Sequence, residues 1–222
     1  GDEENNLLVY NLHNEKPLTV LNSQTSNVSS ITSLIFSDNE DNVIVGSNRG
    51  SINVWDLNTL KSTNGLEQFV LLEGHAVEVT SFAVDSNSDN VLASGSYDTN
   101  VKIWDTRLKN CLHVLKAHSR QVCSLAISPD SRYVLSGSED TTAQCYDLRM
   151  FRPVFEYTVG ANVLCLTFHK HSMVFAAGCS DRMARLYQLA SPFSLTASTR
   201  NESMPVVSTY FYGKNFLFTA AS

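Results

Sequence analysis

The sequence lacks the features that mark membrane, nucleotide-binding and nucleic-acid-binding proteins. None of its apolar runs approaches the ~18 residues of a membrane-spanning helix. No glycine-rich phosphate loop follows a strand pattern and opens a helix, and no run of basic and aromatic residues suggests contact with DNA or RNA. We therefore expect no membrane, no nucleic acid and no cofactor. The acidic, polar start of the chain also leads us to expect no secretory or transit peptide.

Cysteine is scarce and scattered. The five cysteines form no Cys-x-x-Cys pair and lie inside apolar strand-like runs. We interpret them as small packing residues of a protein kept in a reducing compartment, and we expect a cytoplasmic location.

What the sequence contains instead is an internal repeat. Five aromatic residues end short apolar runs at intervals of 45, 49, 42 and 41 residues: Tyr10, Trp55, Trp104, Tyr146 and Tyr187. Small Gly- and Ser-rich runs precede these aromatics, as in VLASGSYD and VLSGSED. A period of about 40–45 residues with such runs predicts an all-β protein, a β-propeller built from four-stranded blades.

The alternation of apolar and polar residues predicts four strands, a to d from the inside outward, in four complete blades. We number these blades 2 to 5 and place them over residues 28–72, 77–115, 120–158 and 161–198, within one propeller domain spanning residues 1–222. In blade 3 the strands are Val79–Val84, Val91–Ser96, Asn100–Asp105 and Cys111–Leu115. Small residues in strand b should let neighbouring blades approach closely.

Each end of the chain supplies half a blade. Residues 1–21 read as strands c and d of blade 1, and residues 204–222 read as strands a and b of blade 6. The two halves form one composite blade of a five-bladed ring, or flanking segments complete a ring of six or seven. We favour the second reading, because an open strand edge is an aggregation liability.

The repeat resembles the WD40 propeller family, through Leu72-Glu73-Gly74-His75 and Val101-Lys102-Ile103-Trp104-Asp105. Over residues 50–148 it is similar to the WD40 domain of katanin regulatory subunits, where Ser96-Tyr97-Asp98-Thr99-Asn100 precedes Trp104-Asp105-Thr106-Arg107. This resemblance implies a non-enzymatic domain that targets a microtubule-severing ATPase complex to microtubules, spindle poles or centrosomes. Its partners would be tubulin and, through a helical domain absent from this chain, the katanin ATPase.

The family resemblance also implies hydrogen-bonded tetrads inside the blades. Blade 3 has all four residues at the required spacing, namely His75, Ser94, Asp98 and Trp104. Blade 4 has His118, Ser136, Asp140 and, in place of tryptophan, Tyr146. Because the Ser, His and Asp are then committed to structure, we predict no catalytic residues, although the same three residue types form hydrolase triads. The His169-Lys170-His171 run has too few ligands for a metal site.

Basic residues concentrate in the second half of the chain. Residues 1–100 carry 14 acidic and 3 basic side chains, whereas residues 101–222 carry 8 acidic and 13 basic ones. We predict that six basic residues in a–b and c–d loops of blades 3 to 5 form an arc on one face that binds an acidic partner: Arg107, Lys109, Arg132, Arg149, Arg152 and Lys170. The alternative is that these arginines make ordinary ion pairs with nearby turn aspartates, among them Asp105, Asp130 and Asp147.

A second functional class remains open. Trp104-Asp105-Thr106-Arg107 and Tyr146-Asp147-Leu148-Arg149 fit the W-D-x-R box of substrate receptors for cullin–RING ubiquitin ligases. This resemblance implies a substrate adaptor, with the arginine facing the ligase.

Overall fold

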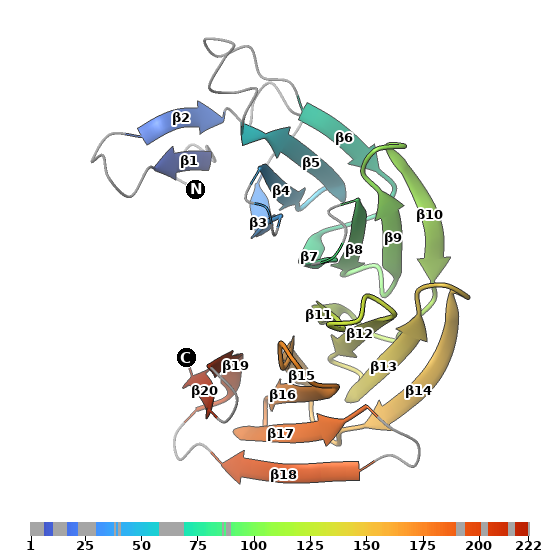
Figure 1. Cartoon of the computed structure of the whole chain (residues 1–222), viewed down its shortest axis with the longest axis vertical. Helices are drawn as coiled ribbons and strands as arrows, with labels where there is room; N and C mark the ends of the chain where they lie inside the picture. The colour runs from blue at the N-terminus through green and yellow to red at the C-terminus, as the bar shows by residue number, and fades with distance from the viewer. Residues whose placement is uncertain are drawn as a thin grey trace.

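A computed structural model of the chain describes residues 7–10, 17–21, 30–37, 39, 41–57, 69–85, 87, 90–189, 194–200, 204–212 and 216–221. The described residues form twenty strands (Figure 1), which confirms the all-β prediction. In this part of the chain no helix exists that is long and apolar enough to cross a bilayer.

Four antiparallel sheets of four strands form the complete blades. Blade 2 contains β3 (Ile31–Phe36), β4 (Asn42–Ser47), β5 (Ser51–Asp56) and β6 (Phe69–Glu73). Blade 3 contains β7 (Val79–Val84), β8 (Val91–Ser96), β9 (Val101–Asp105) and β10 (Asn110–Leu115). Blade 4 contains β11 (Val122–Ile127), β12 (Tyr133–Ser138), β13 (Thr142–Asp147) and β14 (Arg152–Thr158). Blade 5 contains β15 (Val163–Phe168), β16 (Val174–Cys179), β17 (Met183–Gln188) and β18 (Ser194–Arg200).

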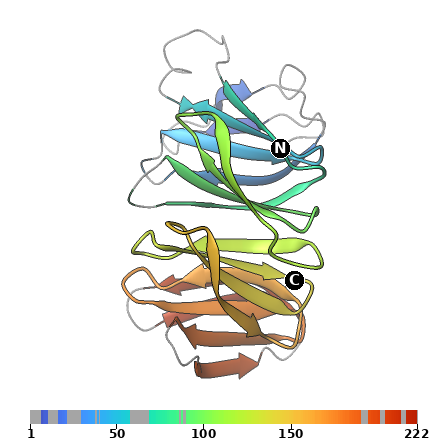
Figure 2. The same cartoon turned by 90° about the vertical axis from the view of Figure 1, so that its right-hand side faces the viewer.

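Two smaller sheets lie at the ends of the chain. β1 (Leu7–Tyr10) pairs with β2 (Pro17–Leu21), and β19 (Val206–Tyr212) pairs with β20 (Phe216–Ala221). The six sheets follow one another around an open arc, with each first strand near the centre and each fourth strand at the rim (Figures 1 and 2). The β1–β2 and β19–β20 sheets are separate among the described strands, so the composite blade is not formed in this structure.

The observed strands of the four complete blades begin and end within a few residues of those expected from sequence. β18 continues to Arg200, two residues beyond the predicted end of blade 5 at residue 198. This extension follows from pairing with β17, because Met183 stands opposite Arg200.

Neighbouring blades meet through a glycine in strand b of one blade and a valine at the start of strand a of the next. A Cβ added to Gly95 would lie 2.6 Å from Val122 Cγ1, closer than real carbon atoms approach. The same contact recurs at three other joints, between Gly46 and Val79, Gly137 and Val163, and Gly178 and Val206. The predicted role of small strand b residues is thus confirmed.

Hydrogen bonds add to the packing at these joints. Thr32 Oγ1 donates to the carbonyl of Val79 at 2.6 Å, and Thr80 Oγ1 donates to that of Val122 at 2.5 Å. Three of the four apolar clusters among the described residues span two neighbouring blades; Trp104 of blade 3, for example, packs with Ile52 and Leu72 of blade 2. Neighbouring blades thus share much of their apolar core.

Candidate functional site

Blade 3 contains a continuous hydrogen-bonded chain that begins at Asp98 in the turn after β8. The Asp98 carboxylate lies 2.9 Å from His75 Nδ1, and His75 Nε2 lies 2.7 Å from Ser94 Oγ. Trp104 Nε1 donates to the same Ser94 oxygen at 2.7 Å. The arrangement fits a His75 that donates from Nδ1 to Asp98 and accepts from the Ser94 hydroxyl at Nε2.

The burial of this chain decides what it can do. Ser94 is 0% exposed and Trp104 is 1% exposed. A serine with its hydroxyl between an imidazole and an indole, and with no surface open to solvent, cannot reach a substrate. The trio of Ser94, His75 and Asp98 therefore stabilises the blade, because each of its buried polar groups has a partner.

His75 in blade 3 and His118 at the equivalent place in blade 4 are uncharged near neutral pH. Burial lowers the pKa of His75 below its ordinary value of 6.5, and burial likewise lowers the pKa of His118. Burial alone would raise the pKa of Asp98, but the hydrogen bond from His75 and those from backbone N–H groups outweigh it and lower this pKa. Blade 3 thus pairs an ionised aspartate with an uncharged imidazole near neutral pH.

In blade 4, hydrogen bonds join three of the four predicted tetrad residues. His118 Nδ1 lies 2.9 Å from Asp140, and His118 Nε2 lies 2.8 Å from Ser136 Oγ. The fourth expectation, that Tyr146 takes the place of tryptophan, is wrong as far as its hydrogen bond is concerned. The Tyr146 hydroxyl donates to Gln144 Oε1 at 2.5 Å instead of to Ser136. A phenol carries its donor at the far end of the ring, beyond the position of an indole N–H, so it bonds a different acceptor.

Blade 5 replaces the missing histidine with an arginine that sequence reasoning did not identify. Arg185 in β17 donates to both carboxylate oxygens of Asp181, at 3.0 Å and 2.5 Å. Arg185 occupies the position of Lys102 in β9 and Gln144 in β13, two residues before the repeated aromatic. A polar residue at this strand position was the sequence feature that could have indicated the Arg185–Asp181 pair. The position of blade 2 where a histidine would stand lies outside the described residues.

The turns between strands c and d of blades 3 and 4 have the same geometry. In blade 3 Asp105 Oδ1 accepts from the backbone N–H groups of Arg107 and Leu108, at 2.9 Å and 3.1 Å. In blade 4 Asp147 Oδ1 accepts from those of Arg149 and Met150, at 2.8 Å and 3.2 Å. Lys109 and Phe151 then both take a positive φ, of 55° and 51°. Each aspartate thus caps its turn, and the two residues whose N–H groups it binds, Arg107-Leu108 or Arg149-Met150, are exposed.

Two of the basic side chains make ion pairs within the turns. Arg107 Nη2 lies 3.2 Å from Asp105, and Arg132 Nε lies 3.1 Å from Asp147. The aspartates are nearly buried while both arginines keep about half or more of their side-chain surface exposed. The ion-pair alternative therefore describes Arg107 and Arg132, yet each guanidinium still faces solvent.

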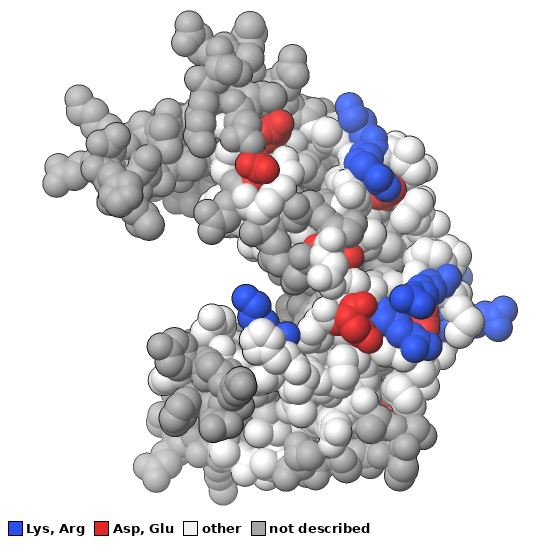
Figure 3. All heavy atoms as spheres, viewed as in Figure 1, with Lys and Arg blue, Asp and Glu red and all other residues white. Residues whose placement is uncertain are grey.

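The six basic residues of the predicted arc are not evenly placed. Arg107 and Lys109 lie on the β9–β10 turn, Arg149 and Arg152 border β14, and Arg132 is joined to the second group through Asp147. Figure 3 shows Lys and Arg side chains gathered over these two turns at the outer rim. Lys170 is exposed on the β15–β16 turn, which lies closer to the central opening (Figure 1), so the structure does not bring it together with the rim residues.

The described residues contain no group of three or more His, Cys, Asp or Glu side chains able to hold a metal ion. His169 lies next to His171, with ring centroids 6.2 Å apart, but its Nδ1 accepts from Ser172 Oγ at 2.9 Å and from the N–H of His171. These contacts give His169 a role in the β15–β16 turn.

A model of the WD domain, G-beta repeat, matches residues 15–56, 66–105, 109–147 and 152–188, which together make up most of the chain. Each matched segment begins with the outer strand of one blade and continues through the three inner strands of the next; residues 66–105, for example, contain β6 to β9.

Similar proteins differ widely in what they do. Pre-mRNA-processing factor 19 of Mus musculus is 28% identical over 70% of this chain and 31% of its own length. Eukaryotic translation initiation factor 3 subunit I of Culex quinquefasciatus is 28% identical over 79% of this chain and 56% of its own length. Nuclear distribution protein PAC1 of Arthroderma benhamiae is 30% identical over 65% of this chain and 30% of its own length. The chain thus spans about a third to a half of these relatives, which are not katanin subunits.

A solved structure shows the same fold. A chain from the crystal structure of a mitotic checkpoint complex superposes with a TM-score of 0.77 at 20% identity, over 90% of this chain and 62% of that one. The matched repeats place the chain in the WD40 family, as a β-propeller of the protein-interaction scaffold type.

Proposed function

We propose that this propeller is a non-catalytic targeting domain of a microtubule-severing complex of the katanin type. Its contact surface would be the pair of basic c–d turns on blades 3 and 4, and its target the acidic surface of tubulin. The sequence resemblance over residues 50–148 supports the complex, and the exposed basic turns support the contact. The proposal implies a cytoplasmic protein located on the microtubule cytoskeleton.

The single observation that carries the contact is the repeated Asp-capped turn. Asp105 and Asp147 face inward, and each carboxylate accepts two hydrogen bonds from backbone N–H groups of its turn. Arg107, Arg149 and Arg152 face outward on adjacent blades. A rigid turn that buries its anion and exposes its cation suits an acidic protein surface, since less side-chain freedom is lost on binding.

Co-sedimentation with microtubules at low ionic strength tests this proposal. The variant Arg107→Glu, Arg149→Glu, Arg152→Glu should pellet at least about tenfold less well than the parent chain, because three attractive contacts become repulsive. Added salt should weaken binding of the parent chain, since exposed charges are screened over about 10 Å at 0.1 M.

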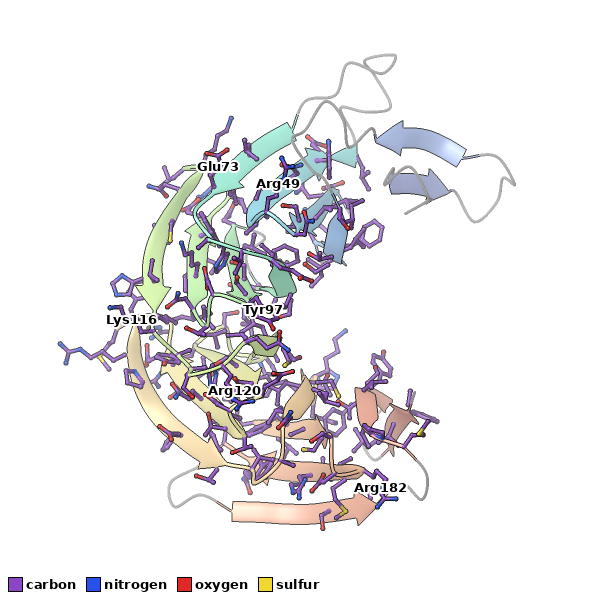
Figure 4. The ribbon with its side chains drawn as sticks, turned by 180° about the vertical axis from the view of Figure 1, so that it is seen from behind. Arg49, Glu73, Tyr97, Lys116, Arg120 and Arg182 are labelled. Atoms are coloured by element: carbon purple, nitrogen blue, oxygen red, sulfur yellow. The ribbon has the colours of Figure 1, made fainter. Side chains whose placement is uncertain are left out.

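The opposite face supplies a matched control. Arg49, Arg120 and Arg182 lie on that face (Figure 4), and their replacement by glutamate changes the net charge by the same amount. This control should pellet like the parent chain. Equal losses in both variants would show that binding follows net charge alone, and unchanged pelleting of a folded rim variant would refute the proposed surface.

The ubiquitin-ligase alternative uses the same two turns and is separated by its partner. Arg107 and Arg149 stand in equivalent capped turns and are exposed, as an adaptor-facing arginine requires. A pull-down that recovers the ligase adaptor, and loses it on Arg107→Ala, would favour this alternative. Recovery of tubulin or a severing ATPase would favour the katanin type.

A further inference from the structure

The outer strand of blade 3 differs from the outer strands of the other blades. β10 is the last strand of its sheet, and among the described strands only β9 is hydrogen-bonded to it. Natural proteins protect such edges with charged residues or proline. The sequences of the other described fourth strands include such a residue: Pro17 in β2, Glu73 in β6, Arg152 and Pro153 in β14, and Arg200 in β18. Among these fourth strands, β10 is the one with neither a charge nor a proline.

The β10 edge is also apolar and exposed. Leu112 is 40% exposed and Val114 is 48% exposed, and Leu108 in the preceding turn is 64% exposed. The strand is held firmly on its other side, since Leu115 is buried in the core and the His113 ring packs at a tilt against Phe151 of blade 4, with ring centroids 4.4 Å apart. The pairing of β10 with β9 shifts its register between Cys111 and His113 and is regular from His113 to Leu115.

The charges at the two ends of β10 indicate what covers it. Lys109 precedes the strand and Lys116 follows it, and both are exposed; Lys116 lies at the rim in Figure 4. In antiparallel pairing of two copies about the strand centre, Lys109 would face Lys116 of the second copy. Like charges directly opposite each other destabilise a strand pair, so this arrangement disfavours a second copy.

We propose that β10 accepts an added β-strand from another protein, an extended segment with apolar β-branched residues in the middle and an acidic residue at each end. Main-chain hydrogen bonds along His113–Leu115 would hold the segment, while Leu112 and Val114 would pack against its apolar residues. Lys109 and Lys116 would pair with its acidic ends. This inference does not depend on the identity of the severing complex.

Fluorescence polarisation with a defined peptide tests the proposal on the whole chain. The probe is a labelled octapeptide of alternating threonine and valine with glutamate at both ends, and its matched control has lysine at both ends. The parent chain should bind the glutamate-ended peptide at least about tenfold more tightly. The variant Lys109→Glu, Lys116→Glu should reverse this preference, which a merely damaged protein would not do.

Two further comparisons separate strand addition from unspecific adhesion. Val114→Glu should weaken binding at least about tenfold, whereas Val154→Glu, at an exposed valine of β14, should have no effect. A peptide methylated on alternate backbone nitrogens should bind less, because main-chain donors are removed. Equal binding of both peptides, equal loss in the two valine variants, or no saturable binding would overturn the proposal. A dimer in sedimentation velocity that Val114→Glu abolishes would overturn the choice of partner.

Discussion

Removing the Ser94 hydroxyl tests the account of the blade 3 chain most directly. In Ser94→Ala one buried acceptor, His75 Nε2, and one buried donor, Trp104 Nε1, lose their partner together, because both bond to the Ser94 oxygen. Each orphaned buried group costs about 1–3 kcal/mol, so the expected loss of unfolding free energy is about 2–6 kcal/mol. Ser94 is 0% exposed, so solvent does not replace the lost contacts.

Ser136→Ala is the matched comparison in blade 4. Its hydroxyl is the partner of His118 Nε2, whereas the Tyr146 hydroxyl is bonded to Gln144. This variant therefore orphans one ring nitrogen and should lose about 1–3 kcal/mol. The two substitutions remove the same atom at equivalent places, so the difference between them isolates the indole contact.

The assay is equilibrium unfolding in urea, together with thermal melting of both variants. For a chain of this size 1 kcal/mol corresponds to about 2–4 °C in Tm. Ser94→Ala should therefore melt lower than Ser136→Ala by several degrees. Equal losses, or a larger loss for Ser136→Ala, would refute the assignment of the Trp104 hydrogen bond and of the Tyr146 exception.

Gly95→Ala should destabilise the chain by about 1–3 kcal/mol, because the new Cβ meets Val122 of the next blade, and no loss in Tm would contradict this packing. Arg185→Met should lower Tm by leaving Asp181 without its bidentate partner, and adding Asp181→Asn should restore part of the loss, which a double-mutant cycle measures. The free energy of unfolding should fall as the pH drops below 6.5, because the unfolded chain then binds protons at His75 and His118 that the folded chain excludes. It should fall again below about pH 4, where Asp98 and Asp140 become protonated. A flat Tm between about pH 7 and about pH 5 would argue against buried neutral histidines.

Strand positions were predictable because the repeat supplies the same pattern several times. Apolar alternation and Gly/Ser-rich turns placed β7 to β9 within a residue of where they lie. The His75 chain was also predictable, since all of its members belong to the repeated motif of the family.

The departures from the motif were not predictable from spacing alone. Tyr146 occupies the aromatic position, but the reach of its hydroxyl and the presence of Gln144 two residues earlier decide its hydrogen bond. Arg185 bonds Asp181 because no histidine occupies that part of blade 5, and the position of an arginine on a strand does not reveal which carboxylate it reaches. The rim or inner placement of a basic residue likewise depends on which strands its turn connects, the two outer strands of the blade or the two inner ones.

The glycine–valine joints between blades have a consequence for how such a protein changes in size. Blades 3, 4 and 5 each offer the same recess on one side and the same valine on the other, as Gly95 and Val79 do in blade 3. A blade copied in tandem would meet both neighbours with a fitting joint already in place. The number of blades can therefore change by duplication without a new interface, and the surface turns are then free to diverge from one copy to the next.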